Sequence, residues 1–363
     1  MGFSCGIIGL PNAGKSTIFN ALTAAGAQVA NYPFCTIDPN QGIVPVPDER
    51  LHKLAQFLRP EKVTPTVLEF WDIAGLVRGA SQGEGLGNRF LGYIRNVDAV
   101  AHVVRCFEAE NVVHVHGSVD PRRDMEIIQT ELILADFQTV EKRLEKMAHQ
   151  AKVGDKKAAA EIPVLQALHD HLAAGKPAAR LNASGDGERV ARSLELLTAK
   201  PQVYVANVNE KELKERRFIP KVEEAAASEK APVVIVCGDL EAEMAELAEG
   251  ERADFLREMG LSESALNQLI RVGYGILHLI TFYTTVGTEL RAWTIPRGTH
   301  VPQAAGKIHT DMERGFIRAE VISFAEFTAA GSMAQAREKG LIRVEGKDYI
   351  VQDGEILHIR FHV

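Results

Sequence analysis

The stretch GLPNAGKS, residues 9–16, constrains this chain more than any other segment. It matches the pattern GxxxxGK[ST], follows an apolar run typical of a strand, and opens a helical run. In that context backbone N–H groups surround phosphate oxygens, and the helix N-terminus favours negative charge. We therefore predict a nucleotide phosphate site in which Lys15 reaches the β and γ phosphates and Ser16 binds Mg²⁺. The predicted phosphate-loop residues are Asn12, Ala13, Gly14, Lys15, Ser16 and Thr17.

Apolar runs and helical patterns alternate over the first hundred residues, which predicts an α/β domain with a parallel-rich sheet. From about residue 125 the apolar period becomes helical, and a Gly154–Asp155 turn separates two stripes. We predict an inserted antiparallel helical hairpin, a coiled coil; the alternative is two helices packed on the main core. The stripes contain Ile133, Phe137, Val140, Leu144, Met147 and Ala151, then Ile162, Leu165, Leu168 and Leu172. Strand signals resume at 202–207 and 231–238, and the tail reads as a small α+β module.

A second motif, DIAGL at residues 72–76, follows the run VLEFW. At the carboxyl end of a strand, Asp72 can hydrogen-bond the direct ligands of Mg²⁺ without binding the ion itself. The Gly75 N–H can sense the γ phosphate. The glycine-rich segment that follows predicts a switch that rearranges. In the preceding loop, NYPFCTID offers Thr36 as a second Mg²⁺ ligand, with a plain surface threonine as the alternative.

The position after the switch glycine lacks the glutamine with which many GTPases orient water, since Leu76 stands there. Intrinsic hydrolysis should therefore be slow unless another group positions the nucleophile. The loop ENVVHVHGS offers His114, because a loop histidine can accept from or donate to water near neutral pH. The alternative is a solvated histidine without a role.

Base selection depends on NVNE, residues 207–210, which stands where the guanine-reading NKxD motif belongs. Glu210 is one methylene longer than aspartate, so a double contact to guanine becomes doubtful, at a cost of about 1–3 kcal/mol of discrimination. Asn207 can still serve N7 and the amino group of adenine, while Val208 removes the lysine stem that covers the base. We therefore predict ATP, with GTP binding weakened. Gly238, in VCGDL, is a weaker candidate for the base edge.

Composition narrows the setting. A formal charge of −7 and a pI near 6.0 argue against coating nucleic acid by bulk positive charge. The four cysteines lack CxxC spacing, which fits a reducing cytoplasm, and no apolar run approaches the roughly 18 residues of a membrane span. Cys35, beside Thr36, could act as a redox switch, with an apolar filler as the favoured alternative.

With these motifs in hand, the chain resembles the YchF-type, Obg-like ATPases along its whole length. The resemblance rests on residues 32–37, 72–88, 102–108 and 207–210, and on RAWTIP and AAGKIHTDMERGFIRAEVI in the tail. It implies an Obg-type P-loop domain at 1–122 and 200–278, a helical hairpin at 123–199, and a β-grasp (TGS, ubiquitin-like) module at 279–363.

The same resemblance implies function. It suggests an ATPase that associates with the ribosome and is a monomer off it, with Mg²⁺ at Ser16 and Thr36, low intrinsic hydrolysis, and water positioning by His114. Asn12 matches a position that binds K⁺ in some relatives. Two other functions stay open, namely a nucleotide-gated binding module with incidental turnover and a GTPase with relaxed base contacts. The hairpin carries a modest basic excess, suited to RNA or merely solvated, from Lys142, Arg143, Lys146, Lys152, Lys156 and Lys157.

Overall fold

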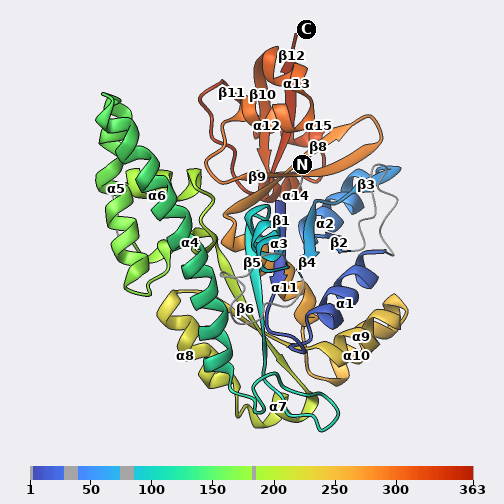
Figure 1. The fold of residues 1–363 in the computed structure, drawn as a ribbon. Helices are drawn as coiled ribbons and strands as arrows, with labels where there is room; N and C mark the ends of the chain where they lie inside the picture. The colour runs from blue at the N-terminus through green and yellow to red at the C-terminus, as the bar shows by residue number, and fades with distance from the viewer. Residues whose placement is uncertain (1–2, 28–39, 74–85, 182–184, 363) are drawn as a thin grey trace. The chain divides into compact units, whose positions relative to one another are not determined.

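The computed structural model describes residues 3–27, 40–73, 86–181 and 185–362 (Figure 1). The chain divides into two compact units. One contains Phe3–Ile43 and Glu69–Gly273, and the other contains Val44–Leu68 together with the chain from Tyr274 onward. Each unit is built around its own six-stranded sheet. No helix in the described part of the chain is long and apolar enough to cross a membrane.

The sheet of the first unit has the strand order β2-β4-β1-β5-β6-β7. β1 pairs with β5, β5 with β6, and β6 with β7, all in parallel, which confirms the α/β prediction. Parallel pairing brings the carboxyl ends of these strands to one edge, with Arg105 opposite Asn207 and Val208 opposite Cys237. The strands are β1 (Phe3–Ile8), β2 (Gln41–Pro45), β4 (Val67–Asp72), β5 (Ala99–Arg105), β6 (Gln202–Val208) and β7 (Val233–Cys237).

Helices cover both faces of this sheet, with α4 and α8 on one side of the strands and α1 and α9 on the other (Figure 1). The first face is apolar because alternate side chains of β5, Val100 and Val104, point to the same side. The helices of this unit are α1 (Lys15–Ala27), α3 (Leu86–Arg95), α4 (Pro121–Lys152), α5 (Lys156–Ala173), α6 (Gly185–Ser193), α7 (Glu210–Glu215), α8 (Ile219–Glu229), α9 (Gly238–Glu246), α10 (Glu249–Glu258) and α11 (Ala265–Ile276), with short 3-10 turns at Ala178–Arg180 and Leu197–Ala199.

Helices α4 and α5 lie side by side (Figure 1). The predicted stripe residues of both helices meet in one apolar cluster, which also takes in Ala191 of α6 and Leu196. The turn between them contains the predicted Gly154–Asp155 pair. The Asp155 side chain caps α5 by accepting from the N–H groups of Lys157 and Ala158. The stripe residues of the two helices therefore share one apolar cluster, and this cluster extends beyond the two helices.

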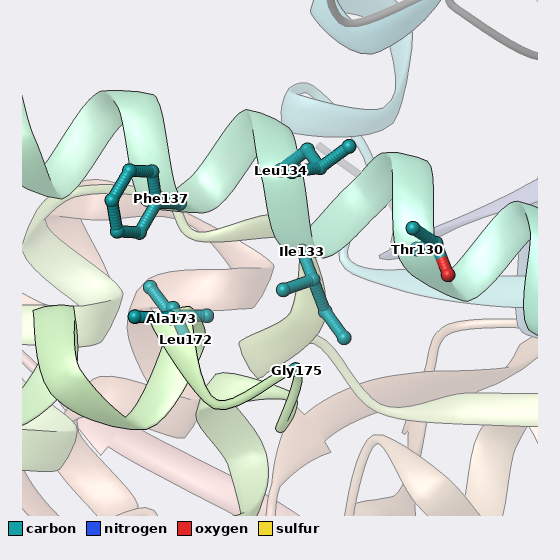
Figure 2. Close-up of a pocket in the computed structure, with 7 residues that line it drawn as sticks. All are labelled: Thr130, Ile133, Leu134, Phe137, Leu172, Ala173 and Gly175. Carbon is teal, nitrogen blue, oxygen red and sulfur yellow. The ribbon is translucent and has the colours of Figure 1, made fainter.

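A pocket of about 330 Å³ opens on this pair of helices. Figure 2 shows its lining, with Ile133, Leu134 and Phe137 on α4 and with Leu172 and Ala173 at the end of α5. Thr130 and Gly175 complete the lining, which is apolar apart from the Thr130 hydroxyl and contains no titratable side chain.

The second unit has a mixed sheet of order β11-β10-β12-β8-β9-β3. β8 with β9, β10 with β12, and β10 with β11 are antiparallel, whereas β12 with β8 and β3 with β9 are parallel. The elements are α2 (Glu49–Leu58), β3 (Lys62–Thr64), β8 (Leu279–Val286), β9 (Glu289–Pro296), α12 (Val301–Ile308), α13 (Thr310–Arg314), β10 (Phe316–Ser323), α14 (Phe324–Ala330), α15 (Met333–Glu338), β11 (Arg343–Glu345) and β12 (Glu355–Phe361).

Residues 44–68 belong to the second unit, whereas the sequence-based boundaries placed them in the nucleotide-binding domain. Helix α2 buries Leu51 and Leu54 against Tyr283 and Phe327 of the C-terminal elements, and β3 forms the edge of their sheet. Apolar packing explains the difference, because the buried face of α2 has its partners more than 200 residues further along the chain.

Candidate nucleotide-binding site

The phosphate loop connects β1 to α1 and is held by Asn207 at the end of β6. The Asn207 side chain is 4% exposed. Its Nδ2 donates to the Ala13 carbonyl at 2.9 Å, and its Oδ1 accepts from the Gly238 N–H at 3.2 Å. Because Nδ2 carries two hydrogens, one donor remains for a nucleotide. Asn207 therefore ties the phosphate loop to the first residue of α9, a role that the sequence did not reveal.

Backbone geometry makes glycine necessary in this loop. Gly14 has a φ of +93°, and a Cβ built on it would lie 2.0 Å from Nδ2 of Asn207. Gly9 shows the same constraint, since its Cβ would lie 2.4 Å from the Val103 carbonyl oxygen. The glycines of the motif therefore permit close packing of backbone and amide as well as access for phosphate.

Lys15, the first residue of α1, is 7% exposed. Its Nζ donates to the Leu10 carbonyl at 2.9 Å. Burial lowers the pKa of this ammonium, while the charge of Asp72 opposes that shift. The ammonium thus lies inside the phosphate loop, where a phosphate oxygen can replace the Leu10 carbonyl as its acceptor.

Ser16 and Asp72 come together as predicted, since Ser16 Oγ donates to Asp72 Oδ2 at 2.9 Å. The other carboxylate oxygen, Oδ1, is buried and has no hydrogen-bond partner among the residues that the structure describes. A buried carboxylate oxygen beside a hydroxyl fits a hard cation such as Mg²⁺, which binds oxygen ligands and keeps some of its waters. Thr36, Gly75 and Leu76 lie outside the described residues.

The predicted base-side residues lie around the carboxyl ends of β6 and β7. Glu210 is exposed in the first turn of α7, whereas the Val208 side chain is 2% exposed and packs into the apolar core. Only the backbone of Val208 is therefore available to a nucleotide. Gly238 lies against α1, where an added Cβ would be 3.4 Å from Thr17 Cγ2.

His114 lies in the loop between β5 and α4, which contacts the phosphate loop through the Asn12 Nδ2 bond to the Val113 carbonyl at 3.0 Å. Its Nε2 is 2.9 Å from Oδ2 of Asp124, in the first turn of α4. Sequence reasoning missed Asp124, and also Arg105, whose guanidinium is buried and bonds two carbonyls of the same loop. A charged residue that ends an apolar strand was the available signal for Arg105.

Burial makes the other titratable groups near the site unsuitable as acids, bases or nucleophiles at neutral pH. Burial, helped by the charge of Lys15, lowers the pKa of His102 to about 3, so this ring is neutral at neutral pH. Cys5, Cys106 and Cys237 are buried free thiols, and burial with the charge of Asp98 raises the pKa of Cys5 to about 12. Cys35 lies outside the described residues, so the redox switch stays a prediction.

One of the basic side chains on α4 and α5 is paired with a carboxylate. Nε and Nη2 of Arg143 each lie 2.9 Å from a carboxylate oxygen of Glu161, so this guanidinium joins α4 to α5. A bidentate ion pair leaves Arg143 less available to an RNA phosphate. The remaining lysines of the set carry the basic excess.

Comparison with known proteins gives matches along the whole chain. The family model described as "50S ribosome-binding GTPase" matches residues 4–157. The model for the YchF GTPase C-terminal region, described as "Protein of unknown function (DUF933)", matches residues 279–362. The first model thus covers the N-terminal phosphate loop, and the second covers the C-terminal elements.

Curated relatives and a solved structure extend the similarity. "Ribosome-binding ATPase YchF" of Bacillus subtilis (strain 168) is 51% identical over 366 residues, and the protein of that name from Escherichia coli O157:H7 is 52% identical over 363 residues. Each alignment covers 100% of both chains. The structure of the Schizosaccharomyces pombe YchF GTPase is 35% identical, covers 99% of this chain and 97% of that chain, and has a TM-score of 0.90.

Proposed function

The chain belongs to the YchF family, and from this premise we propose that it is a ribosome-associated ATPase that hydrolyses ATP to ADP and phosphate as a conformational switch. Identity of about half the residues over the full length supports the activity. The observation that carries the proposal is the preformed phosphate loop, in which the buried Lys15 ammonium and the Ser16–Asp72 pair lie at the start of α1.

Hydrolysis needs charge stabilisation and a positioned water. A bond forms between the water oxygen and the γ phosphorus, and the bond from that phosphorus to the β–γ bridging oxygen breaks, so ADP leaves with the electron pair and the water proton passes to the phosphate products. Lys15 stabilises the charge on the β and γ phosphates, and backbone N–H groups of the loop orient them. Bound Mg²⁺ would supply charge neutralisation from Ser16 and Thr36, supported by Asp72. His114 positions the water once its ring faces the γ phosphate.

Three parts of the chain would divide nucleotide binding and ribosome contact among them. We assign the phosphate loop and base contacts to an Obg-type nucleotide-binding domain, ribosome contact to the antiparallel hairpin of 123–199, and a further ribosome contact to a β-grasp module at 279–363, completed by residues 44–68. The basic lysines of α4 and α5 support the hairpin assignment. A cytoplasmic monomer off the ribosome and a K⁺ ion at Asn12 belong to the same proposal.

Ribosome dependence tests the central proposal. We expect intact ribosomes to raise the rate of phosphate release at saturating ATP and Mg²⁺ several-fold. His114→Ala should lower kcat about tenfold with little change in KM, because the positioning of water acts in the transition state. Rates should be measured for both proteins with and without ribosomes. A nucleotide-gated binding module would instead show neither stimulation nor loss.

Base preference is the second testable part, and the names of related proteins differ on it, since the relatives are called ATPase while the solved structure is called GTPase. We expect wild type to bind ATP more tightly than GTP, and Glu210→Asp to shift the ratio of the two dissociation constants about tenfold toward GTP. A shorter carboxylate can reach the N1–H and amino group of guanine. Isothermal titration with each nucleotide and Mg²⁺ measures the shift.

Glu215→Asp on the same helix makes the same chemical change away from the base and serves as the matched control. Wild-type GTP binding equal to or stronger than ATP binding would rule out the ATP assignment and favour the relaxed GTPase.

A further inference from the structure

The loop of residues 106–120, here called the histidine loop, accepts hydrogen bonds from two side chains outside it, those of Arg105 and Asn12. Arg105 is 3% exposed, and its Nε and Nη2 donate to the carbonyls of Phe107 at 3.1 Å and Val112 at 3.0 Å. From the other side, Asn12 of the phosphate loop donates to the Val113 carbonyl at 3.0 Å. The residue next to His114 is thus bound directly to the nucleotide site.

Both nitrogens of the His114 ring are engaged. Nδ1 accepts from the His116 N–H at 3.1 Å, so the proton of the neutral ring lies on Nε2. Nε2 donates to Oδ2 of Asp124 at 2.9 Å. The two side chains are 6% and 5% exposed. In this conformation the ring offers no nitrogen to an attacking water.

Asp124 is held independently of the histidine. Nε and Nη2 of Arg123 donate to its Oδ1 at 3.2 and 3.0 Å, and the buried Arg105 guanidinium adds favourable charge. The next residues of α4, Met125 and Ile128, are buried in the two apolar clusters that cover the sheet. The carboxylate therefore lies on a helix that packs against the sheet, whereas His114 lies on a loop.

We propose that Asp124 is a positioning residue that holds His114 in a withdrawn resting conformation, and that hydrolysis requires the bond between them to break. The inference rests on the proposed role of His114 in positioning water. Because α4 is 32 residues long and is the first helix of the predicted hairpin, a force on the hairpin that displaces the first turn of α4 would move the carboxylate away from the ring. A partner that contacts the hairpin would then control hydrolysis through this single bond.

The rival explanation is that Asp124 orients His114 for catalysis, as a carboxylate orients histidine in hydrolase triads. That role requires the second ring nitrogen to face the substrate. Here the second nitrogen accepts from the loop's own backbone and the ring is buried. The two roles predict opposite effects, since loss of a restraint raises the rate and loss of an orienting group lowers it.

Asp124→Asn tests the proposal in the full-length protein without ribosomes. The amide keeps the size of the side chain but loses the charge of the acceptor, so we expect kcat for phosphate release to rise about tenfold while KM for ATP changes little. Combination with His114→Ala should abolish the rise, because the gain acts through the ring. Asp120→Asn removes a charge at the N-cap of the same helix, where the side chain makes no capping bond, and should leave kcat unchanged.

Each outcome is decisive. Unchanged or lower kcat in Asp124→Asn, or a rise that persists without His114, overturns the restraint while leaving the ATPase assignment intact. If His114→Ala alone does not lower kcat, the water-positioning role and the restraint both fail.

A measurement on wild type covers the case in which Asp124→Asn folds poorly. Nitrogen NMR of ¹⁵N-histidine protein should show the Nε2–H tautomer of His114, with a slowly exchanging proton, in the absence of nucleotide. We expect that protection to be lost with Mg²⁺ and a non-hydrolysable ATP analogue. A rapidly exchanging His114 proton in the free protein, or protection that survives binding of the analogue, would refute the restraint.

Discussion

Gly14→Ala should weaken ATP binding at least about 100-fold. An added Cβ would lie 2.0 Å from Nδ2 of Asn207, the atom that holds the Ala13 carbonyl, and the backbone φ of +93° is already unfavourable for alanine. To relieve the clash the Asn207 side chain must move, and it then loses its hydrogen bond with the Gly238 N–H. Strain of about 1–3 kcal/mol and a lost buried hydrogen bond of about 1–3 kcal/mol together account for the expected change.

Isothermal titration with ATP and Mg²⁺ measures this effect, and Gly92→Ala is the matched control. Gly92 lies in α3, has no heavy atom within 4 Å of a built Cβ, and should accept alanine without loss of affinity. Thermal unfolding of both variants separates a local change from global destabilisation. ATP binding within threefold of wild type for Gly14→Ala would show that the Asn207 link is dispensable.

Residues 274–363 expressed alone should fail to fold cooperatively. Without α2, the side chains of Tyr283, Leu290 and Phe327 lose the apolar cover of Leu51 and Leu54. Each such side chain is worth about 1.5–3 kcal/mol of burial, and their sum approaches the whole stability of a domain, which is about 5–15 kcal/mol.

Polar contacts add to the same expected loss. The Tyr283 hydroxyl donates to Asp48 at 2.5 Å, and Nη1 of Arg50 donates to Asp353 at 2.9 Å. Strand β3 also pairs in parallel with β9. Without the segment that carries Asp48, Arg50 and β3, the buried Tyr283 hydroxyl has lost its acceptor and β9 has lost its edge partner.

Circular dichroism and thermal unfolding test this prediction. The matched partner is residues 44–68 joined to 274–363 by a flexible linker of about 20 Gly and Ser residues, and it should regain a cooperative transition. A sharp transition in the fragment without 44–68 would show that the C-terminal elements are self-sufficient.

The sequence predicted those features whose signals are local. The phosphate loop, the strands that flank it and the α4–α5 stripe depend on short periodic patterns, and each is present in the structure. The Ser16–Asp72 pair was predictable because both motifs stand at the carboxyl ends of strands in a parallel sheet.

Contacts between distant segments were not predictable in this way. Nothing local to the sequence KVT indicates that β3 pairs with β9, and the three-residue strand is too short for a periodic signal. The two hydrogen bonds of the Asn207 side chain and the His114–Asp124 pair likewise depend on where side chains lie after folding. Thr36 and Gly75, outside the described residues, stay predictions.

The membership of residues 44–68 in the C-terminal unit has a consequence for how the protein is made. During translation this segment leaves the exit tunnel about 200 residues before Tyr274. At about 5–20 residues per second, its apolar face waits about 10–40 s for its binding partners. For that interval Leu51 and Leu54 are open to chaperones or to a neighbouring nascent chain, so the speed of elongation through the intervening codons sets the risk of misassembly.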